Sequence, residues 1–136
     1  MTRTAARANI ETVMTWLDAM RRGDLDTAVA CFAPDIVWQG LVPGVQCANR
    51  DEVREMLSES INEYPDVKHL ELIGAENHAV LGVASPQLQE LAGVQLHGQL
   101  FNVFTIHDNR IVHARDFALR VEAQAAASIH ELPHWR

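Results

Sequence analysis

The chain is poor in basic residues. Lysine occurs once among 136 residues, at Lys68, and the formal net charge is −7. A protein that binds nucleic acid or an anionic lipid surface needs a concentration of positive charge, which this composition does not supply. We therefore expect neither nucleic acid nor a membrane among the partners.

Long apolar runs are also missing. No stretch approaches the roughly 20 apolar residues of a membrane-spanning helix. The first residues, MTRTAARANIETVM, contain arginines but no apolar run of the length found in a signal peptide. These absences predict a soluble, cytoplasmic protein.

Cysteine is scarce, and the histidines are dispersed. Cys31 and Cys47 are the two cysteines and lack CxxC spacing, so we expect free, buried thiols. Residues 130–134 match H-E-x-x-H, the zinc-protease signature. Pro133 would break the helix that this motif requires, so we interpret the match as chance. We expect neither a metal site nor a cofactor.

The residues that are present predict one compact domain over positions 1–136, since nearly half of them are hydrophobic. Apolar residues at spacings of three and four predict an amphipathic helix over 5–22, ended by Gly23. Asp24 suits the N-cap of a short second helix that runs through Phe32 and ends near Pro34. Asn49 and Glu52 resemble a capping box that opens a third helix.

The remaining segments favour strands, with a last helix at the end. Strands are predicted at 35–39, 67–76 and 78–85, with a loop at 40–48 and either a connection or an edge strand at 86–93. The alanine-rich stretch 121–129 predicts a short C-terminal helix, with a tail to residue 136. This order predicts an α+β fold, in which three N-terminal helices pack on one face of a mostly antiparallel sheet.

Residues 96–119, LHGQLFNVFTIHDNRIVHARDFAL, read as two strands joined by a tight turn. The turn decides where Asp116 points, because a one-residue slip exchanges the two faces of a strand. A two-residue loop would place Asp116 with Phe101 and Val103. A three-residue loop, with Asn109 left-handed, would pair Ile106 with Arg110 and place Asp116 with Asn102 and Phe104. We favour the three-residue loop.

In the favoured register the two faces of the strand pair differ in character. One face carries Asp116 and Asn102 among small and apolar side chains, which are Leu100, Phe104, Val112, Ala114 and Ala118. The opposite face carries Phe101, Val103, Ile111, Phe117 and Leu119. An apolar sheet surface of this size needs a cover, and a homodimer through this outer face is the partner that we expect.

Three segments carry a resemblance to a known family: WLDAMRRGDLDTAVACFAPDIVWQG, NRDEVREML and NVFTIHDNRIVHARDF. They resemble the helix–glycine–aspartate–helix–strand opening, the helix start and the closing strand pair of SnoaL-like members of the nuclear transport factor 2 superfamily. The resemblance implies a cone-shaped α+β fold with a pocket between the curved sheet and the helices. The fold hosts ketosteroid isomerases, epoxide hydrolases, polyketide cyclases, dehydratases and proteins that only bind.

Asp116, in its Arg-Asp-Phe context, resembles the final-strand aspartate of the limonene-epoxide-hydrolase and cyclase branches. The chain departs from the epoxide hydrolases in their Arg-x-Asp on the third strand, where it reads VLGVASPQ. It departs from the isomerases in their first-strand aspartate and first-helix tyrosine, where it has Trp38-Gln39 and, nearby, Trp16.

The candidate site follows from these residues. Asp116 is the candidate general acid or base for a small apolar molecule, and Asn102 would polarise an oxygen of that molecule. The candidate ligand-binding residues are Trp38, Phe104, Trp16, Leu100 and Ala114. An enzyme of the isomerase, cyclase or hydrolase type predicts a cavity with Asp116 at its base. A non-catalytic binder predicts a cavity whose polar groups satisfy one another, and a dimerisation module predicts side chains that fill the space.

Overall fold

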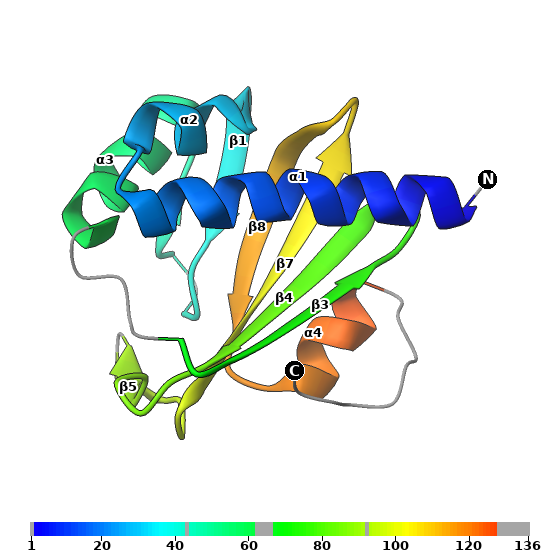
Figure 1. The fold of residues 1–136 in the computed structure, drawn as a ribbon. Helices are drawn as coiled ribbons and strands as arrows, with labels where there is room; N and C mark the ends of the chain where they lie inside the picture. Colours follow the sequence, from blue (N-terminus) through cyan, green and yellow to red (C-terminus); the bar gives the residue numbers. More distant parts are fainter. Residues whose placement is uncertain (1, 43, 62–66, 92, 128–136) are drawn as a thin grey trace.

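A computed structural model describes residues 2–42, 44–61, 67–91 and 93–127, and it shows helices packed on a strongly twisted sheet (Figure 1). The helices are α1 (Thr2–Arg22), α2 (Leu25–Ala30), α3 (Arg50–Ser60) and α4 (Arg120–Ala126). The long strands are β1 (Phe32–Gln39), β3 (His69–Gly74), β4 (His78–Ala84), β7 (Gln99–His107) and β8 (Arg110–Phe117). Three short strands complete the set: β2 (Gln46–Cys47), β5 (Glu90–Leu91) and β6 (Val94–Gln95).

The main sheet has six strands in the order β2-β1-β8-β7-β4-β3. Every neighbouring pair is antiparallel except β1 and β8, which run parallel. The predicted α+β class and the mostly antiparallel sheet are confirmed. Strands β5 and β6 form a separate two-stranded hairpin. Strand β5 lies within the 86–93 segment, for which a connection or an edge strand was predicted, and β6 follows that segment.

The helix starts follow the predicted capping chemistry. The carboxylate of Asp24 accepts a hydrogen bond from the Thr27 backbone N–H at 3.2 Å and so begins α2. The Asn49 side chain accepts from the Glu52 N–H at 2.9 Å, while Glu52 accepts from the Ala48 N–H at 2.6 Å. This pair resembles the expected capping box of α3, except that Glu52 accepts from the N–H of Ala48 and not from that of the N-cap Asn49.

The second helix ends earlier than predicted. It stops at Ala30, and Phe32 already belongs to β1, where it pairs with Ile111 of β8. The predicted helix through Phe32 is therefore wrong. Phe32 is completely buried in the core between the helices and the sheet, so tertiary packing outweighs the local helical pattern. The pairing of β1 with β8 is irregular between Phe32 and Val37, and this interval accommodates Pro34, which has no N–H to donate.

The turn between β7 and β8 has two residues. Asp108 and Asn109 both have positive φ, 51° and 62°, which is the backbone of a type I′ hairpin turn. His107 pairs with Arg110 and Ile106 with Ile111, so the predicted three-residue loop and the pairing of Ile106 with Arg110 are wrong.

A bulge nevertheless restores the predicted facing of Asp116. The next pair after Ile106 and Ile111 is Thr105 with His113, so β8 advances two residues where β7 advances one. From there Asn102 lies opposite Asp116. The expectation that these two share a face is confirmed. Ile111 precedes the bulge, so its predicted place on the outer face is wrong, and it is buried in the inner core.

The helices occupy both faces of the sheet. Helix α1 lies across the inner face (Figure 1), where Val13 and Leu17 are completely buried. Helix α4 packs on the outer face, and its Ala123 joins a second cluster with Phe101 and Phe117. The ion pair between Arg120 Nε and the buried Glu71 carboxylate, 2.9 Å long, fixes the start of α4 there.

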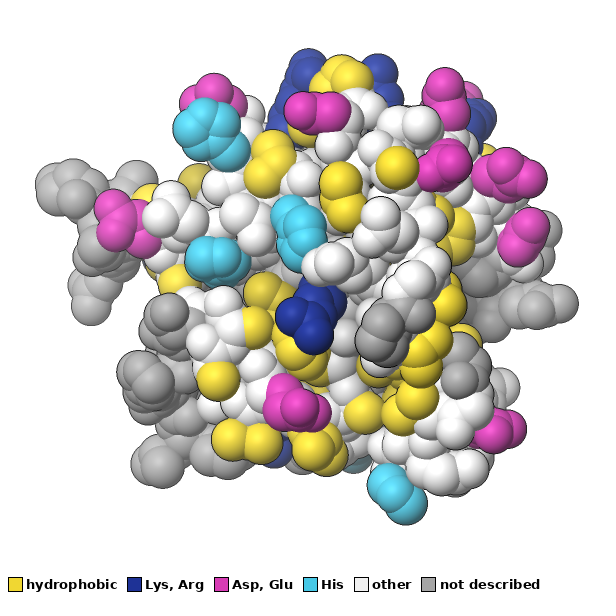
Figure 2. Space-filling model, turned by 180° about the vertical axis from the view of Figure 1, so that it is seen from behind, with side chains coloured by type: hydrophobic (Ala, Val, Ile, Leu, Met, Phe, Trp, Pro, Cys, Tyr) yellow, Lys and Arg dark blue, Asp and Glu magenta, His cyan; other side chains and the backbone are white. Residues whose placement is uncertain are grey.

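The outer face, which is the side seen in Figure 2, thus has a cover from its own chain. Phe101, Val103 and Phe117 are all buried, whereas Leu119, at the start of α4, is about half exposed. Our reason for expecting a second subunit on this face was an uncovered apolar surface, and α4 removes that reason. The homodimer stays a prediction. None of the described helices is long and apolar enough to span a membrane.

The left-handed turn gives a first test. We expect Asn109→Val to lower the free energy of unfolding by about 1–3 kcal/mol, because a β-branched side chain is strained at positive φ. Asn109 is exposed, so packing does not change. Asn109→Gly is the control and should keep stability within about 0.5 kcal/mol. Urea denaturation measures both variants, and equal stability of the Val and Gly variants would contradict the type I′ turn.

Candidate functional site

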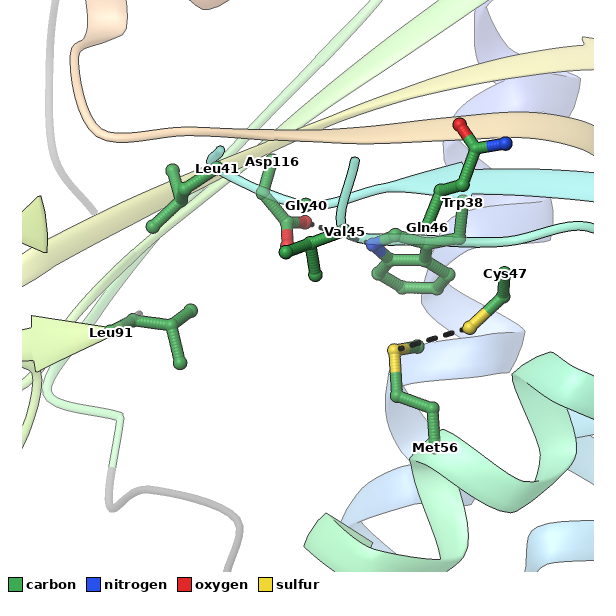
Figure 3. Close-up of a pocket in the computed structure, with 9 residues that line it drawn as sticks. All are labelled: Trp38, Gly40, Leu41, Val45, Gln46, Cys47, Met56, Leu91 and Asp116. Carbon is green, nitrogen blue, oxygen red and sulfur yellow. Dashed lines mark hydrogen bonds between the residues drawn. The ribbon is translucent and has the colours of Figure 1, made fainter. Parts of the chain in front are cut away.

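The candidate site is a pocket of about 260 Å³ at the β2 edge of the main sheet (Figure 3). Its lining residues come from β1, β2, β8, α3, the β5–β6 hairpin and the segment between β1 and β2. Its walls are mostly apolar. The described lining residues are Trp38, Gly40, Leu41, Val45, Gln46, Cys47, Met56, Leu91 and Asp116. Leu91 comes from the hairpin and faces the pocket from the side opposite Met56 (Figure 3).

Strand pairing brings Trp38 and Asp116 together. Trp38 of β1 lies between Cys47 of β2 and Ala114 of β8. Asp116 follows Ala114 by two residues and therefore emerges on the same face of β8. Gly40 follows Trp38 in the same way, and a Cβ there would lie 3.0 Å from the Val45 Cγ1 atom. The absence of a side chain at Gly40 lets Val45 approach closely, and the Gly40 N–H donates to the Val45 carbonyl at 2.7 Å.

The two oxygens of Asp116 have different environments. Oδ1 accepts a hydrogen bond from Trp38 Nε1–H at 3.0 Å and another from Asn102 Nδ2–H at 2.6 Å. Oδ2 accepts no hydrogen bond from the part of the chain that the structure describes. One oxygen is thus held in place by two donors, while the other is available to a bound molecule.

The environment of Asp116 also changes its acidity. Burial raises the pKa of this carboxyl from its ordinary value of 3.8 to about 6, and the hydrogen bonds from Trp38 and Asn102 oppose that rise by stabilising the ionised form. Near neutral pH the group is mostly ionised but close to its midpoint. It can therefore accept a proton and return it, which is what a general acid–base catalyst does.

Not all of the predicted ligand-binding residues line this pocket. Trp38 does, whereas Trp16, Phe104 and Ala114 are buried behind it in the core. The Trp16 ring lies 5.9 Å from the Trp38 ring and 5.4 Å from that of Phe104, so these aromatic side chains pack against one another. Leu100 is partly buried against the same core. Trp16, Phe104 and Ala114 thus support the wall that Trp38 forms.

Sequence analysis missed most of the lining residues. Leu41, Val45 and Gln46 belong to a segment that we interpreted as a loop, and Leu91 to one that we interpreted as a connection or an edge strand. Apolar residues in a connecting segment could have identified these positions, because such segments normally face water. Met56 lies in the predicted third helix, and a predicted helix does not by itself distinguish pocket residues from core residues.

Cys47, to which we assigned no chemistry, also faces the pocket. Its Sγ lies 3.9 Å from Met56 Sδ (Figure 3), and both cysteines are free thiols. Burial raises the pKa of the Cys47 thiol, and the negative charges of Glu52, Asp116 and Glu55 raise it further. The thiol is therefore protonated and contributes a soft, apolar surface.

Within the described ranges, no three histidine, cysteine, aspartate or glutamate side chains are grouped so that they could hold a metal ion. His69, His97 and His107 are exposed, as expected, and His78 and His113 are partly buried. The H-E-x-x-H match at 130–134 lies outside the described residues.

Comparison with known families identifies the chain at this point. The model of the SnoaL-like domain family matches residues 13–114, which is most of the sequence. The protein belongs to the SnoaL-like domain family. That assignment confirms the resemblance seen in the sequence, while a search of curated proteins gives no match.

Solved structures share the fold of this SnoaL-like protein. A Kribbella flavida protein superposes with a TM-score of 0.65 at 21% identity, covering 89% of this chain and 97% of its own. A putative polyketide cyclase from Sinorhizobium meliloti gives 0.61 at 20% identity, with coverages of 79% and 94%. An LEH-like epoxide hydrolase from M. tuberculosis gives 0.61 at 19% identity, with coverages of 90% and 96%. At these identities the likeness shows the fold alone.

The raised pKa of Asp116 has a consequence for stability. Between pH 4 and 6 the unfolded chain ionises this carboxyl while the folded chain keeps it protonated, so stability falls as pH rises through this range. The difference between about 6 and 3.8 corresponds to roughly 3 kcal/mol. We expect Asp116→Asn to be more stable than the wild type by up to that amount at pH 7.5, with a much smaller difference at pH 4.

Urea denaturation of both proteins at the two pH values measures this effect, because the contributions of other titrating groups cancel in the comparison. Asp35→Asn, an exposed substitution on β1, is the matched control and should change stability little at either pH. A gain for Asp116→Asn that is the same at pH 4 and pH 7.5 would contradict the raised pKa.

Proposed function

We propose that this SnoaL-like protein binds a small apolar molecule and acts on it as a cofactor-independent enzyme, with Asp116 as the general acid–base group. The observation that carries the proposal is the asymmetry of this buried carboxyl. Oδ1 is fixed by Trp38 and Asn102, while Oδ2 has no partner among the described residues at the pocket. A catalytic base needs this combination of fixed orientation and an available oxygen.

The acidity of Asp116 suits proton transfer. With a pKa of about 6, roughly nine carboxyls in ten are ionised at pH 7, and the conjugate acid is still strong enough to return the proton. The mostly apolar walls reduce the access of water to the carboxyl on the enclosed sides of the pocket, which strengthens the electrostatic interactions there. The raised pKa of Asp116 and the limited access of water to its carboxyl both result from its buried position.

Asn102 takes a different role in this proposal from the one expected from the sequence. Its amide N–H donates to Asp116 over 2.6 Å, so its described hydrogen bond goes to the carboxylate. We therefore assign Asn102, together with Trp38, as a positioning residue. Trp38 in addition forms a wall of the pocket.

Isomerisation or cyclisation fits the pocket better than hydrolysis. A single carboxylate can remove a proton from carbon and return it elsewhere on the same molecule. Hydrolysis needs further polar groups to hold water and to protonate the leaving oxygen. The only carboxylate on the described lining is that of Asp116, and β4, at the place of the epoxide hydrolases' Arg-x-Asp, carries no charge from Ala79 to Ala84.

A second candidate function is non-catalytic binding of the same molecules. The observation that favours it is that Oδ1 is already satisfied by two internal donors, as expected in a pocket whose polar groups partner one another. The third possibility, a dimerisation module with a filled interior, is disfavoured by the 260 Å³ of space beside Asp116.

A neutral probe ketone separates an enzyme from a binder. In the isomerisation of 3-cyclohexen-1-one, a C–H bond beside the carbonyl breaks and its proton moves to Asp116 Oδ2. The electron pair forms a dienolate, and the proton then returns to the γ carbon to give the conjugated ketone. We expect catalysis measurable by ultraviolet absorbance, with a rate that rises with pH through about 6 as Asp116 ionises.

Asp116→Asn should lower this rate by about a hundredfold or more, and Asp35→Asn should leave it unchanged. A wild-type rate equal to the rate in buffer, or an Asp116→Asn rate equal to that of the wild type, would contradict the proposed acid–base role. Retained binding of the probe without turnover would instead support the non-catalytic alternative.

Trp38→Phe tests the positioning role. Loss of the indole N–H removes a bond that stabilises the ionised carboxyl, so the pKa of Asp116 should rise and the midpoint of the pH–rate profile should move above 6. Trp16→Phe is the control, because Trp16 packs in the same aromatic cluster but does not bond Asp116. A midpoint that moves equally in both variants would show a packing effect in place of the hydrogen bond.

A further inference from the structure

The charges around the pocket are unusually one-sided. None of its nine described lining residues carries a positive charge, and the ionisable ones are Asp116 and the protonated thiol of Cys47. The exposed Glu52 and Glu55 of α3 lie close enough to Cys47 to raise the pKa of its thiol, as Asp116 does from β8. Negative charge therefore reaches the interior of the pocket from two separate elements.

The nearest basic residues of α3 point elsewhere. Arg54 forms an ion pair with Asp26 at 2.6 Å, beside α2. Arg50 donates to the backbone carbonyl of Phe32 over 3.3 Å, at the start of β1. Both guanidinium groups are thus engaged on the side of α3 that faces α2 and β1, and the negative charge near Cys47 stays uncompensated by them.

We propose that the pocket selects apolar molecules that carry a cationic nitrogen and discriminates against carboxylates of the same shape. The ammonium group donates to Asp116 Oδ2, and the apolar body lies against Trp38, Met56 and Leu91. This inference rests on the same pocket as the proposed function and specifies a class of ligand for it. An ammonium group at Oδ2 occupies the oxygen that the proposed reaction uses as its base, so such a molecule competes with the substrate of that reaction.

Electrostatics separates the three possible ligand charges. A cation makes a charge-assisted hydrogen bond to the ionised carboxylate, which is stronger than the bond that a neutral hydroxyl makes. An anion binds beside Asp116 only after that carboxyl takes up a proton. Because about nine carboxyls in ten are ionised at pH 7, this requirement alone weakens anion binding about tenfold. Repulsion by Glu52 and Glu55 adds to that loss.

The size of the pocket limits the molecule. Sites for drug-sized ligands span about 300–1,000 Å³, and this one has about 260 Å³. A body of one or two fused rings fills such a space. The pocket is open on one side, so an ammonium group at Oδ2 keeps part of its hydration, which reduces the desolvation cost that a fully buried ion pair carries.

Three indoles of nearly equal shape form the test: tryptamine with an ammonium group, tryptophol with a hydroxyl and indole-3-acetate with a carboxylate. Isothermal titration calorimetry of the full chain at pH 7 measures the dissociation constant of each. We expect tryptamine to bind at least tenfold more tightly than indole-3-acetate and at least threefold more tightly than tryptophol. In Asp116→Asn the advantage of tryptamine over tryptophol should disappear, while tryptophol binding changes less than threefold.

Two controls separate the sources of the preference. Asp35→Asn should leave all three dissociation constants unchanged, because Asp35 is exposed and is not part of the pocket. Glu55→Gln should reduce the preference for tryptamine by a few-fold at low salt and by less at 0.5 M salt, because the charge of an exposed carboxylate is screened.

Tighter or equal binding of indole-3-acetate, equal binding of tryptamine and tryptophol, or no measurable binding of tryptamine would each overturn the inference. These results are independent of the ketone isomerisation, in which the probe is neutral. A protein that isomerises the ketone through Asp116 but shows no preference for tryptamine keeps its proposed function and loses only the charge selectivity.

Discussion

One extra residue in β8 decides which side chains of this strand face the pocket and which face α4. The bulge lies between the pairs Ile106–Ile111 and Thr105–His113, and it sets the face that each later residue of β8 occupies. Without it, Asp116 would emerge on the outer face among the side chains that α4 covers. With it, Asp116 lies beside Asn102 and Trp38 at the pocket. The outer face keeps Phe101 and Phe117, which pack beneath α4.

Much of the fold could be predicted because its local signals agree with its tertiary packing. The caps at Asp24 and Asn49 and the spacing of apolar residues in α1 determine three helices, and alternation with β-branched residues determines the strand pair. The facing of Asp116 was predicted correctly through an incorrect turn. The shorter loop and the bulge each shift the register by one residue in the same direction, and a total shift of two residues returns Asp116 to the predicted face.

Other features could not be predicted, for identifiable physical reasons. Phe32 closely follows a helical segment in the sequence. Its place in a strand depends on long-range contacts, because it pairs with Ile111 and its ring packs against two tryptophan rings. The helix α4 is rich in alanine, so its sequence predicts a helix without indicating that Ala123 packs on the outer face. The pocket depends on the 40–47 loop and on Leu91, whose positions are set by long-range contacts. Among the predicted site residues, Asp116, Asn102 and Trp38 come together, whereas Phe104 and Trp16 support them from the core.

A carboxyl buried in this way lowers the free energy of unfolding at neutral pH. Two hydrogen bonds to Oδ1, from Trp38 and Asn102, offset part of that loss by stabilising the ionised form. The same burial raises its pKa, directs its other oxygen to the pocket and makes the pocket negative. The proposed acid–base role and the proposed charge selectivity therefore both depend on one environment. The most direct measurement is the titration of the Asp116 carboxyl carbon by ¹³C nuclear magnetic resonance, with its signal assigned by its absence in Asp116→Asn. The structure predicts a midpoint at about pH 6. A midpoint at or below the ordinary value of 3.8 would contradict the account.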